Sequence, residues 1–304
     1  MICEFVIAEH NRFTALVTYV PQQAFVLPLI IVLLYSIFLR RIKLAAMNTV
    51  ALLIFIFVFL GLNLHLPVSH KSDFKVMTIN VAQSVYDITP LINMVIKEKP
   101  DILLLQEADP LDDRSDAMAN IVTASDYDGT KLYASRIADV AILSRKPLTN
   151  IRSYPLLAGS GRRVLVAETE VNDRQISIAC VHFATNVSKD RSRSMRTHLA
   201  GSAESRMTQA EVVDRELPVE AAIVGGDFNL PPRGLAYRKI TREYRNSFSA
   251  ANGFGYTYPA KIPLMRIDHV LLSKDLSPVK WRAVDTGSSD HLAVIADICF
   301  KNEH

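Results

Sequence analysis

The chain has 304 residues, enough for one large domain or two small ones, and 49% of them are hydrophobic. Its formal net charge of +3 is only mildly basic, so the overall charge does not argue for nucleic acid or another anionic partner. The three cysteines are far apart and odd in number, which argues against a disulfide framework and against a thiolate metal site.

Two apolar stretches occupy much of the first seventy residues, at about 13–39 and about 44–66. The second has no charged residue and is longer than the roughly 20 residues that a membrane-spanning helix needs. The first is interrupted by Pro21 and Pro28. We predict a membrane anchor in residues 1–69 with two transmembrane helices that form a hairpin. A signal peptide is the alternative, but its short apolar core does not match this doubled pattern.

The link between the two stretches contains Arg40, Arg41 and Lys43. Basic residues concentrate in cytoplasmic loops, so this link is expected inside and both chain ends outside. The sequence therefore predicts an integral protein of the plasma or inner membrane, with its C-terminal domain on the extracytoplasmic side.

Polar residues return near residue 70, and residues 70–304 have the pattern of one α/β domain. Helical spacing of apolar residues predicts helices at 86–99, 203–217 and 237–244. Several predicted strands follow one another without a helix, which favours antiparallel pairing in a layered sandwich with helices outside. The predicted strands are 74–81, 101–107, 139–144, 163–171, 175–183, 220–228, 266–273 and 292–300.

Polar side chains cluster at the ends of these strands, and acidic groups there are costly unless they are paired or bound to a cation. Their oxygen-rich chemistry favours Mg²⁺, or alternatively Mn²⁺, over zinc. A metal with nearby bases and donors is what phosphoester hydrolysis needs. The candidate residues are Asn80, Glu107, His182, Asp227, Asn229, Asp268, Asp290 and His291.

Five motifs follow one another along residues 74–300: TINV, LLLQE, GGDFNLPP, RIDHVLLS and GSSDHLAV. In this order they resemble the endonuclease/exonuclease/phosphatase superfamily, which includes deoxyribonuclease I. The resemblance implies a four-layered α/β sandwich of two packed, mostly antiparallel sheets flanked by helices. It also implies Mg²⁺-dependent hydrolysis of phosphoesters by residues 70–304.

The same resemblance assigns roles to the metal side of the site. Glu107 corresponds to the principal metal ligand, with Asn80 helping to place the metal or the phosphate. Asp290 is a second carboxylate, near the metal or on the catalytic histidine. His291 resembles that catalytic histidine, as a general base or a phosphate-orienting cation, and Asp268 holds its ring.

The resemblance assigns the attacking water and the leaving group to the remaining residues. Asp227 and Asn229 would orient or activate water and bind the scissile phosphate. His182 resembles the second histidine of the deoxyribonuclease and sphingomyelinase branches, and Asp139 is a candidate to support it. His269 faces the other side of its strand by the period of two, so a structural role is expected.

Three arginines are candidate contacts for substrate phosphate: Arg191, Arg193 and Arg206. Arg191 and Arg193 lie in a basic run at 188–198, for which a solvated surface loop is an equally good interpretation. The leading prediction is a phosphodiesterase acting on nucleic acid or phospholipid head groups. The alternatives are a phosphomonoesterase on a small polyphosphate such as an inositol phosphate, or a catalytically degenerate membrane interaction protein.

Overall fold

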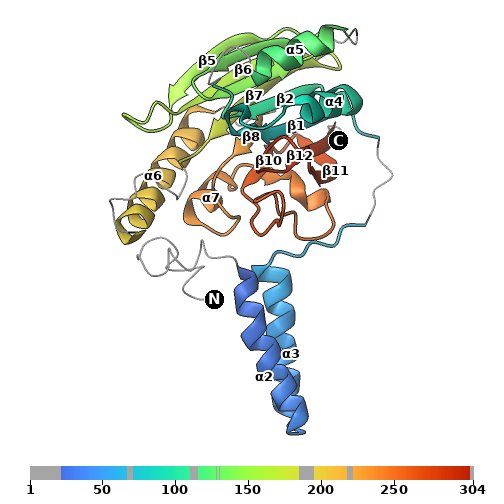
Figure 1. Cartoon of the computed structure of the whole chain (residues 1–304), viewed down its shortest axis with the longest axis vertical. Helices are drawn as coiled ribbons and strands as arrows, with labels where there is room; N and C mark the ends of the chain where they lie inside the picture. The colour runs from blue at the N-terminus through green and yellow to red at the C-terminus, as the bar shows by residue number, and fades with distance from the viewer. Residues whose placement is uncertain are drawn as a thin grey trace.

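Two six-stranded sheets form the described part of the protein above a projecting helical hairpin (Figure 1). The computed structural model describes residues 22–66, 71–109, 116–127, 129, 131–184, 195–217 and 222–301. Within these residues the hairpin precedes the sheets.

The first sheet has β11 at one edge and β3 at the other. Its order is β11 (Leu276–Val284), β12 (Ala293–Phe300), β1 (Phe74–Asn80), β2 (Ile102–Gln106), β4 (Val140–Ser144) and β3 (Tyr133–Ile137). Among these strands only β1 and β2 pair in parallel.

The second sheet has β5 and β9 at its edges. Its order is β5 (Thr149–Pro155), β6 (Arg163–Val171), β7 (Arg174–His182), β8 (Ala222–Asp227), β10 (Asp268–Leu272) and β9 (Arg245–Asn246). Only β7 and β8 are parallel within the described sheet. The prediction of mostly antiparallel sheets is therefore confirmed.

Helices cover the outer face of each sheet, which completes the α/β sandwich. The helices α4 (Thr89–Glu98) and α5 (Ala117–Tyr127) pack on the first sheet, and α6 (Met195–Glu216) and α7 (Leu235–Ile240) pack on the second. Successive residues of a strand point to opposite faces. In β8, Ile223 therefore joins the core between the sheets, whereas Val224 packs under the helices.

The eight predicted strands and three predicted helices are all present, with shifted ends. The structure adds elements that the sequence patterns did not indicate, namely β3, β5, β9, β11 and α5. Short helical turns occur at η5 (Ala82–Ser84) and η6 (Ser247–Ala250).

The hairpin consists of η3 (Gln22–Phe25) with α2 (Val26–Phe38), and α3 (Ile42–Ile54) with the π-helix η4 (Phe55–Phe59). Among the described residues, only 42–59 form a helix long and apolar enough to cross a membrane. The apolar helix over 22–38 is shorter, and residues 13–21 of the first predicted span lie outside the described residues. The second predicted span is corrected at its end, because residues 60–66 leave the helix and run along the domain.

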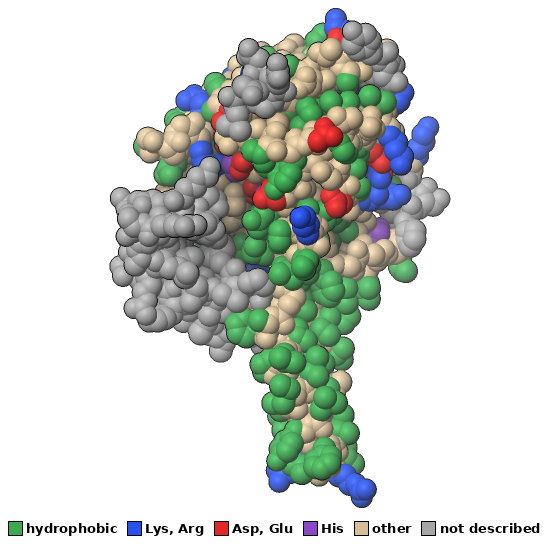
Figure 2. Space-filling model, in the orientation of Figure 1, with side chains coloured by type: hydrophobic (Ala, Val, Ile, Leu, Met, Phe, Trp, Pro, Cys, Tyr) green, Lys and Arg blue, Asp and Glu red, His purple; other side chains and the backbone are tan. Residues whose placement is uncertain are grey.

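Apolar side chains cover the surface of the hairpin, and basic side chains are confined to its tip (Figure 2). Phe38 and Ile42 near the tip are each 81% exposed. A polar contact joins the two helices, where Asn48 Nδ2 donates to Ser36 Oγ at 3.3 Å.

The base of the hairpin is fastened to the α/β domain by hydrogen bonds. Asn63 pairs with Gly253 as an isolated antiparallel bridge, and its side-chain amide donates to the Ala251 carbonyl at 2.7 Å. Gln23 Nε2 donates to the Leu264 carbonyl at 2.9 Å. The hairpin and the domain are thus joined by specific contacts as well as by the chain.

Candidate active site

Three strands of the second sheet carry the predicted site residues at one end. Parallel pairing places His182 opposite Asp227, and antiparallel pairing places Asp268 opposite the same residue. Each of the three lies on the same face of its strand as residues of the core between the sheets, such as Ile178 and Val270. The period of two that builds the core therefore also aims these polar groups into the gap between the sheets.

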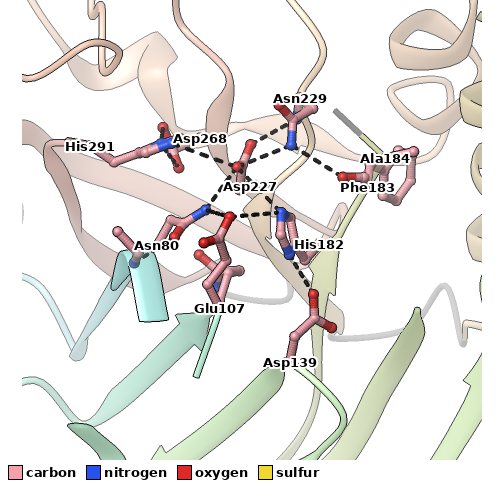
Figure 3. Close-up of polar contacts among 12 residues, drawn as sticks. Asn80, Glu107, Asp139, His182, Phe183, Ala184, Asp227, Asn229, Asp268 and His291 are labelled. Atoms are coloured by element: carbon pink, nitrogen blue, oxygen red, sulfur yellow. Dashed lines mark hydrogen bonds and ion pairs between the residues drawn. The ribbon is translucent and has the colours of Figure 1, made fainter. Parts of the chain in front are cut away.

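The first sheet contributes Asn80 and Glu107 from the ends of two parallel strands. Asn80 Nδ2 lies 3.2 Å from both Glu107 Oε1 and Asp227 Oδ2, so its amide connects the two sheets (Figure 3). Asn80 Oδ1 accepts from the Ala82 backbone N–H at 2.9 Å, which fixes the orientation of this amide. Asn80 is buried, whereas 36% of the Glu107 side chain is exposed at the mouth of the site.

Asp139, in the turn between β3 and β4, supports His182. Asp139 Oδ2 is 2.6 Å from His182 Nδ1, while His182 Nε2 points toward Asp227 Oδ2 at 3.7 Å (Figure 3). Arg162 donates to the same Asp139 oxygen at 3.4 Å and to the His182 carbonyl at 3.2 Å. Burial acts to raise the pKa of Asp139, but the contacts with His182 and Arg162 outweigh it and lower that pKa.

A second histidine and carboxylate pair lies on the other side of Asp227. His291 Nδ1 is 3.0 Å from Asp268 Oδ2, and its Nε2 is 3.9 Å from Asp227 Oδ2. Burial acts to lower the pKa of His291, but the charges of Asp268 and Asp227 outweigh it and raise this pKa to about 10. The ring of Tyr258 packs against His291 with centroids 4.7 Å apart.

Asp227 lies between the two histidines and is buried. Burial and then the charge of Asp268 raise the pKa of Asp227. Asn229 has a positive φ of 49° and folds back, so that its backbone N–H donates to Asp227 Oδ1 at 2.8 Å. Its side-chain amide donates to Asp227 Oδ2 and to the Phe183 carbonyl, both at 3.1 Å.

The glycine before Asp227 is required by its surroundings. Gly226 has φ of +145°, and a Cβ atom there would collide with the Val181 carbonyl of the neighbouring strand. In the GGDFN motif, Gly226 therefore allows the two strands to lie close together, and Asn229 turns the chain in the left-handed backbone conformation.

The donor set fits a hard cation. Asp227, Asp268 and His291 each offer a ligand atom within 4.8 Å of the others, and the Asn80 amide links Glu107 to Asp227. Clustered carboxylates at a buried site need a compensating cation. Carboxylate and amide oxygens suit Mg²⁺ or Mn²⁺.

Asp290 has a different setting from the other predicted residues. It is half-buried, and its backbone carbonyl accepts from Ala260 N–H at 2.7 Å. Within the described part of the chain its carboxylate makes no hydrogen bond, although its charge helps to raise the pKa of His291.

Of the three predicted phosphate contacts, the structure describes only Arg206. Arg206 of α6 is completely buried, which does not fit a direct contact with substrate. Arg191 and Arg193 lie outside the described residues.

His269 lies on the opposite face from Asp268, as its place in the strand predicts. Its Nε2 is 3.0 Å from the Leu230 carbonyl and its ring packs against Phe228 and Tyr237. Burial, with the charge of Arg266, lowers the pKa of His269 to about 3.

Two contributors to the site escaped the sequence patterns. Arg162 and Tyr258 contact the two histidine and carboxylate pairs from loops, where no periodicity marks an inward side chain. The glycines beside Arg162 indicate a turn, but they do not indicate where its guanidinium points.

The Endonuclease/Exonuclease/phosphatase family matches residues 77–291. No curated protein matches the chain.

Solved structures share the fold at low sequence identity. An endonuclease/exonuclease/phosphatase from Beutenbergia cavernae is 16% identical, with a TM-score of 0.57 over 76% of this chain and 72% of that one. The human Nocturnin catalytic domain, solved with bound sulfate, is 18% identical, with a TM-score of 0.57 over 77% of this chain and 97% of that one. D. rerio TDP2, complexed with a single-strand DNA product, is 17% identical, with a TM-score of 0.53 over 74% and 98% of the two chains.

Proposed function

The chain belongs to the endonuclease/exonuclease/phosphatase family, and we propose that it is a divalent-metal-dependent phosphodiesterase anchored in a membrane. One observation carries the catalytic part of this proposal. Two histidine and carboxylate pairs, His182 with Asp139 and His291 with Asp268, flank the buried carboxylate of Asp227.

The metal is best held by carboxylate oxygens and not by His291, because the raised pKa of His291 keeps its ring protonated at neutral pH. Glu107 is the proposed principal ligand, and Asp290 the second nearby carboxylate. Asn80 acts by positioning, because its Oδ1 is already bonded to the Ala82 N–H and its Nδ2 joins Glu107 to Asp227. When bound, Mg²⁺ supplies Lewis-acid polarisation of the phosphoryl oxygens.

Asp227 and Asn229 are the proposed groups for the attacking water. A carboxylate whose pKa is raised by burial is a better proton acceptor than an exposed one. Asn229 holds it by donating from both its backbone and its side chain, so Asp227 has a fixed orientation toward a bound water.

The two histidines have separate proposed roles. His291, whose pKa is raised to about 10, is cationic at neutral pH and acts as a donor to a phosphoryl oxygen. His182 donates from Nδ1 to Asp139 and its Nε2 faces the site, where the doubly protonated ring would give its Nε2 proton to the leaving group.

The hairpin supports the membrane part of the proposal. Its apolar side chains are exposed over the length of both helices, a surface that lipid would cover. The basic tip at Arg40, Arg41 and Lys43 favours a cytoplasmic tip and an extracytoplasmic catalytic domain. A reporter fused after residue 304 tests this orientation, and activity of the reporter only in the cytoplasm would contradict it.

The catalytic proposal is tested with the full chain purified in detergent. It is offered plasmid DNA, abasic DNA, sphingomyelin and inositol phosphates with Mg²⁺, beside Asp227→Ala and His291→Ala. Turnover of DNA or sphingomyelin that both variants lose supports a phosphodiesterase. Turnover of inositol phosphates alone favours the phosphomonoesterase, and turnover that both variants keep would refute the assigned site.

A further inference from the structure

A cavity lies between the base of the hairpin and the α/β domain, apart from the catalytic residues. One wall is formed by Gln23 and Phe59 of the hairpin and by Leu60, which follows it. The other wall includes Arg233, Tyr256 and Arg266 of the domain. The cavity therefore lies where the apolar helices meet the polar domain, which is the level of lipid head groups in the proposed membrane arrangement.

The charge of this cavity is positive. It is lined by two arginines, and no carboxylate is among its described lining residues. Arg233 donates to the Phe59 carbonyl, which keeps its guanidinium at the hairpin wall.

Arg266 gives the stronger evidence for an anion site, because it is only 9% exposed. Its guanidinium stacks on the Phe248 ring at 3.6 Å and donates to the Phe254 carbonyl at 3.0 Å. Its Nε is buried without a hydrogen-bond partner in the described structure. A buried cation with an unused donor is costly unless an anion completes it.

We propose that this cavity binds a phosphate group, with Arg266 and Arg233 as its cationic ligands. Guanidinium groups suit phosphate because their fork of N–H donors matches its oxygens. Basic pockets beside membrane helices recognise anionic head groups in the same way. The lipid source of this phosphate rests on the proposed membrane anchoring, whereas the anion site itself does not depend on catalysis.

The site is tested by thermal unfolding of the full chain. Inorganic phosphate is titrated in detergent, and the chain is separately placed in nanodiscs of phosphatidylcholine with or without phosphatidylglycerol. At ten times the dissociation constant the Tm should rise by about 3–6 °C. The single tryptophan, Trp281, packs on Phe248 with centroids 5.2 Å apart, so its fluorescence gives a second readout beside Arg266.

Four variants decide the outcome. Arg266→Gln and Arg233→Gln should lose the rise in Tm, and Arg152→Gln, at an exposed arginine of β5, should keep it. If Arg266→Gln fails to fold, Arg233→Gln still tests the site. A double His182→Ala and His291→Ala variant should also keep the rise, because phosphate in the catalytic site is then removed as an explanation.

The results show whether the phosphate belongs to a lipid head group or to a soluble anion, and they also show whether the proposed site is wrong. A rise only with phosphatidylglycerol identifies a lipid head group, and an equal rise with inorganic phosphate identifies a soluble anion. No rise in either arm, an undiminished rise in both arginine variants, or a rise lost in the double histidine variant would overturn the site. None of these results depends on whether the chain hydrolyses a phosphoester.

Discussion

Asp139 Oδ2 lies 2.6 Å from His182 Nδ1, although the two residues come from different sheets. The carboxylate orients the ring so that Nε2 faces Asp227. Asp139→Asn should therefore lower kcat about 100-fold with little change in KM. Asp173→Asn, in an exposed turn, is the matched control. A normal kcat with an unshifted pH profile would show that Asp139 does not act through His182.

Removal of metal should abolish activity, and Mg²⁺ should restore it. Glu107→Gln keeps the size of the side chain but removes its charge, so the Mg²⁺ concentration for half-maximal activity should rise roughly tenfold or more. Glu170→Gln, at an exposed position of β6, should leave that concentration unchanged. Activity that persists in EDTA would contradict the metal requirement.

Gly226→Ala should prevent stable folding. The added Cβ meets the Val181 carbonyl, and neither strand can move without displacing Asp227 or His182. We expect a loss of more than about 3 kcal/mol in the free energy of unfolding. Gly159→Ala, at φ of +72° with open space around it, should cost only about 1 kcal/mol. Similar losses in the two variants would show that the collision is relieved.

The buried His269 should make the protein sensitive to mild acid. Its pKa in the folded state is about 3, below the ordinary 6.5, so the unfolded chain binds a proton that the folded protein does not. This contribution to stability is complete above pH 6.5 and falls by about 1.4 kcal/mol per pH unit as the pH drops toward 3. His269→Gln should give a flatter dependence of unfolding free energy on pH between 6.5 and 5. An equally steep dependence in the variant would assign the effect to other groups.

Asn63 should be essential for holding the hairpin against the α/β domain. Its side-chain nitrogen lies 2.7–3.3 Å from three backbone carbonyls, those of Phe248, Ser249 and Ala251. Asn63→Asp replaces this donor with a second acceptor, so stability should fall by about 2–3 kcal/mol. Limited proteolysis between the hairpin and β1 measures the loosening. Asn252→Asp, whose side-chain oxygen already accepts from His65 N–H at 2.7 Å, is the control because it keeps that acceptor.

Much of the sandwich was predictable because its central strands either alternate apolar and polar residues or consist of continuous apolar residues. The edge strand β5 was not, since most of its residues are exposed and its side chains carry no alternating pattern. The strand β11 contains Pro278 and an irregular register, both of which hide a strand from a periodicity argument.

The site was predictable as a list of groups at strand ends, but its pairing was not. His182 and Asp139 are 43 positions apart, and only the packing of one sheet on the other brings them into contact. Arg206 was placed correctly on a helix, but its burial was not predicted. That burial depends on which face of α6 packs on the sheet. Hydropathy likewise extended the second apolar span to residue 66, because it does not register that Asn63 bonds to the domain.

The amide of Asn80 joins a carboxylate of one sheet to a carboxylate of the other. Substitutions deep in the inter-sheet core that slide the layers by a fraction of an ångström would thus separate the catalytic groups while every strand stays folded. Heating should then extinguish turnover several degrees before the molecule melts. The core between the sheets therefore keeps the two layers aligned as well as holding them together.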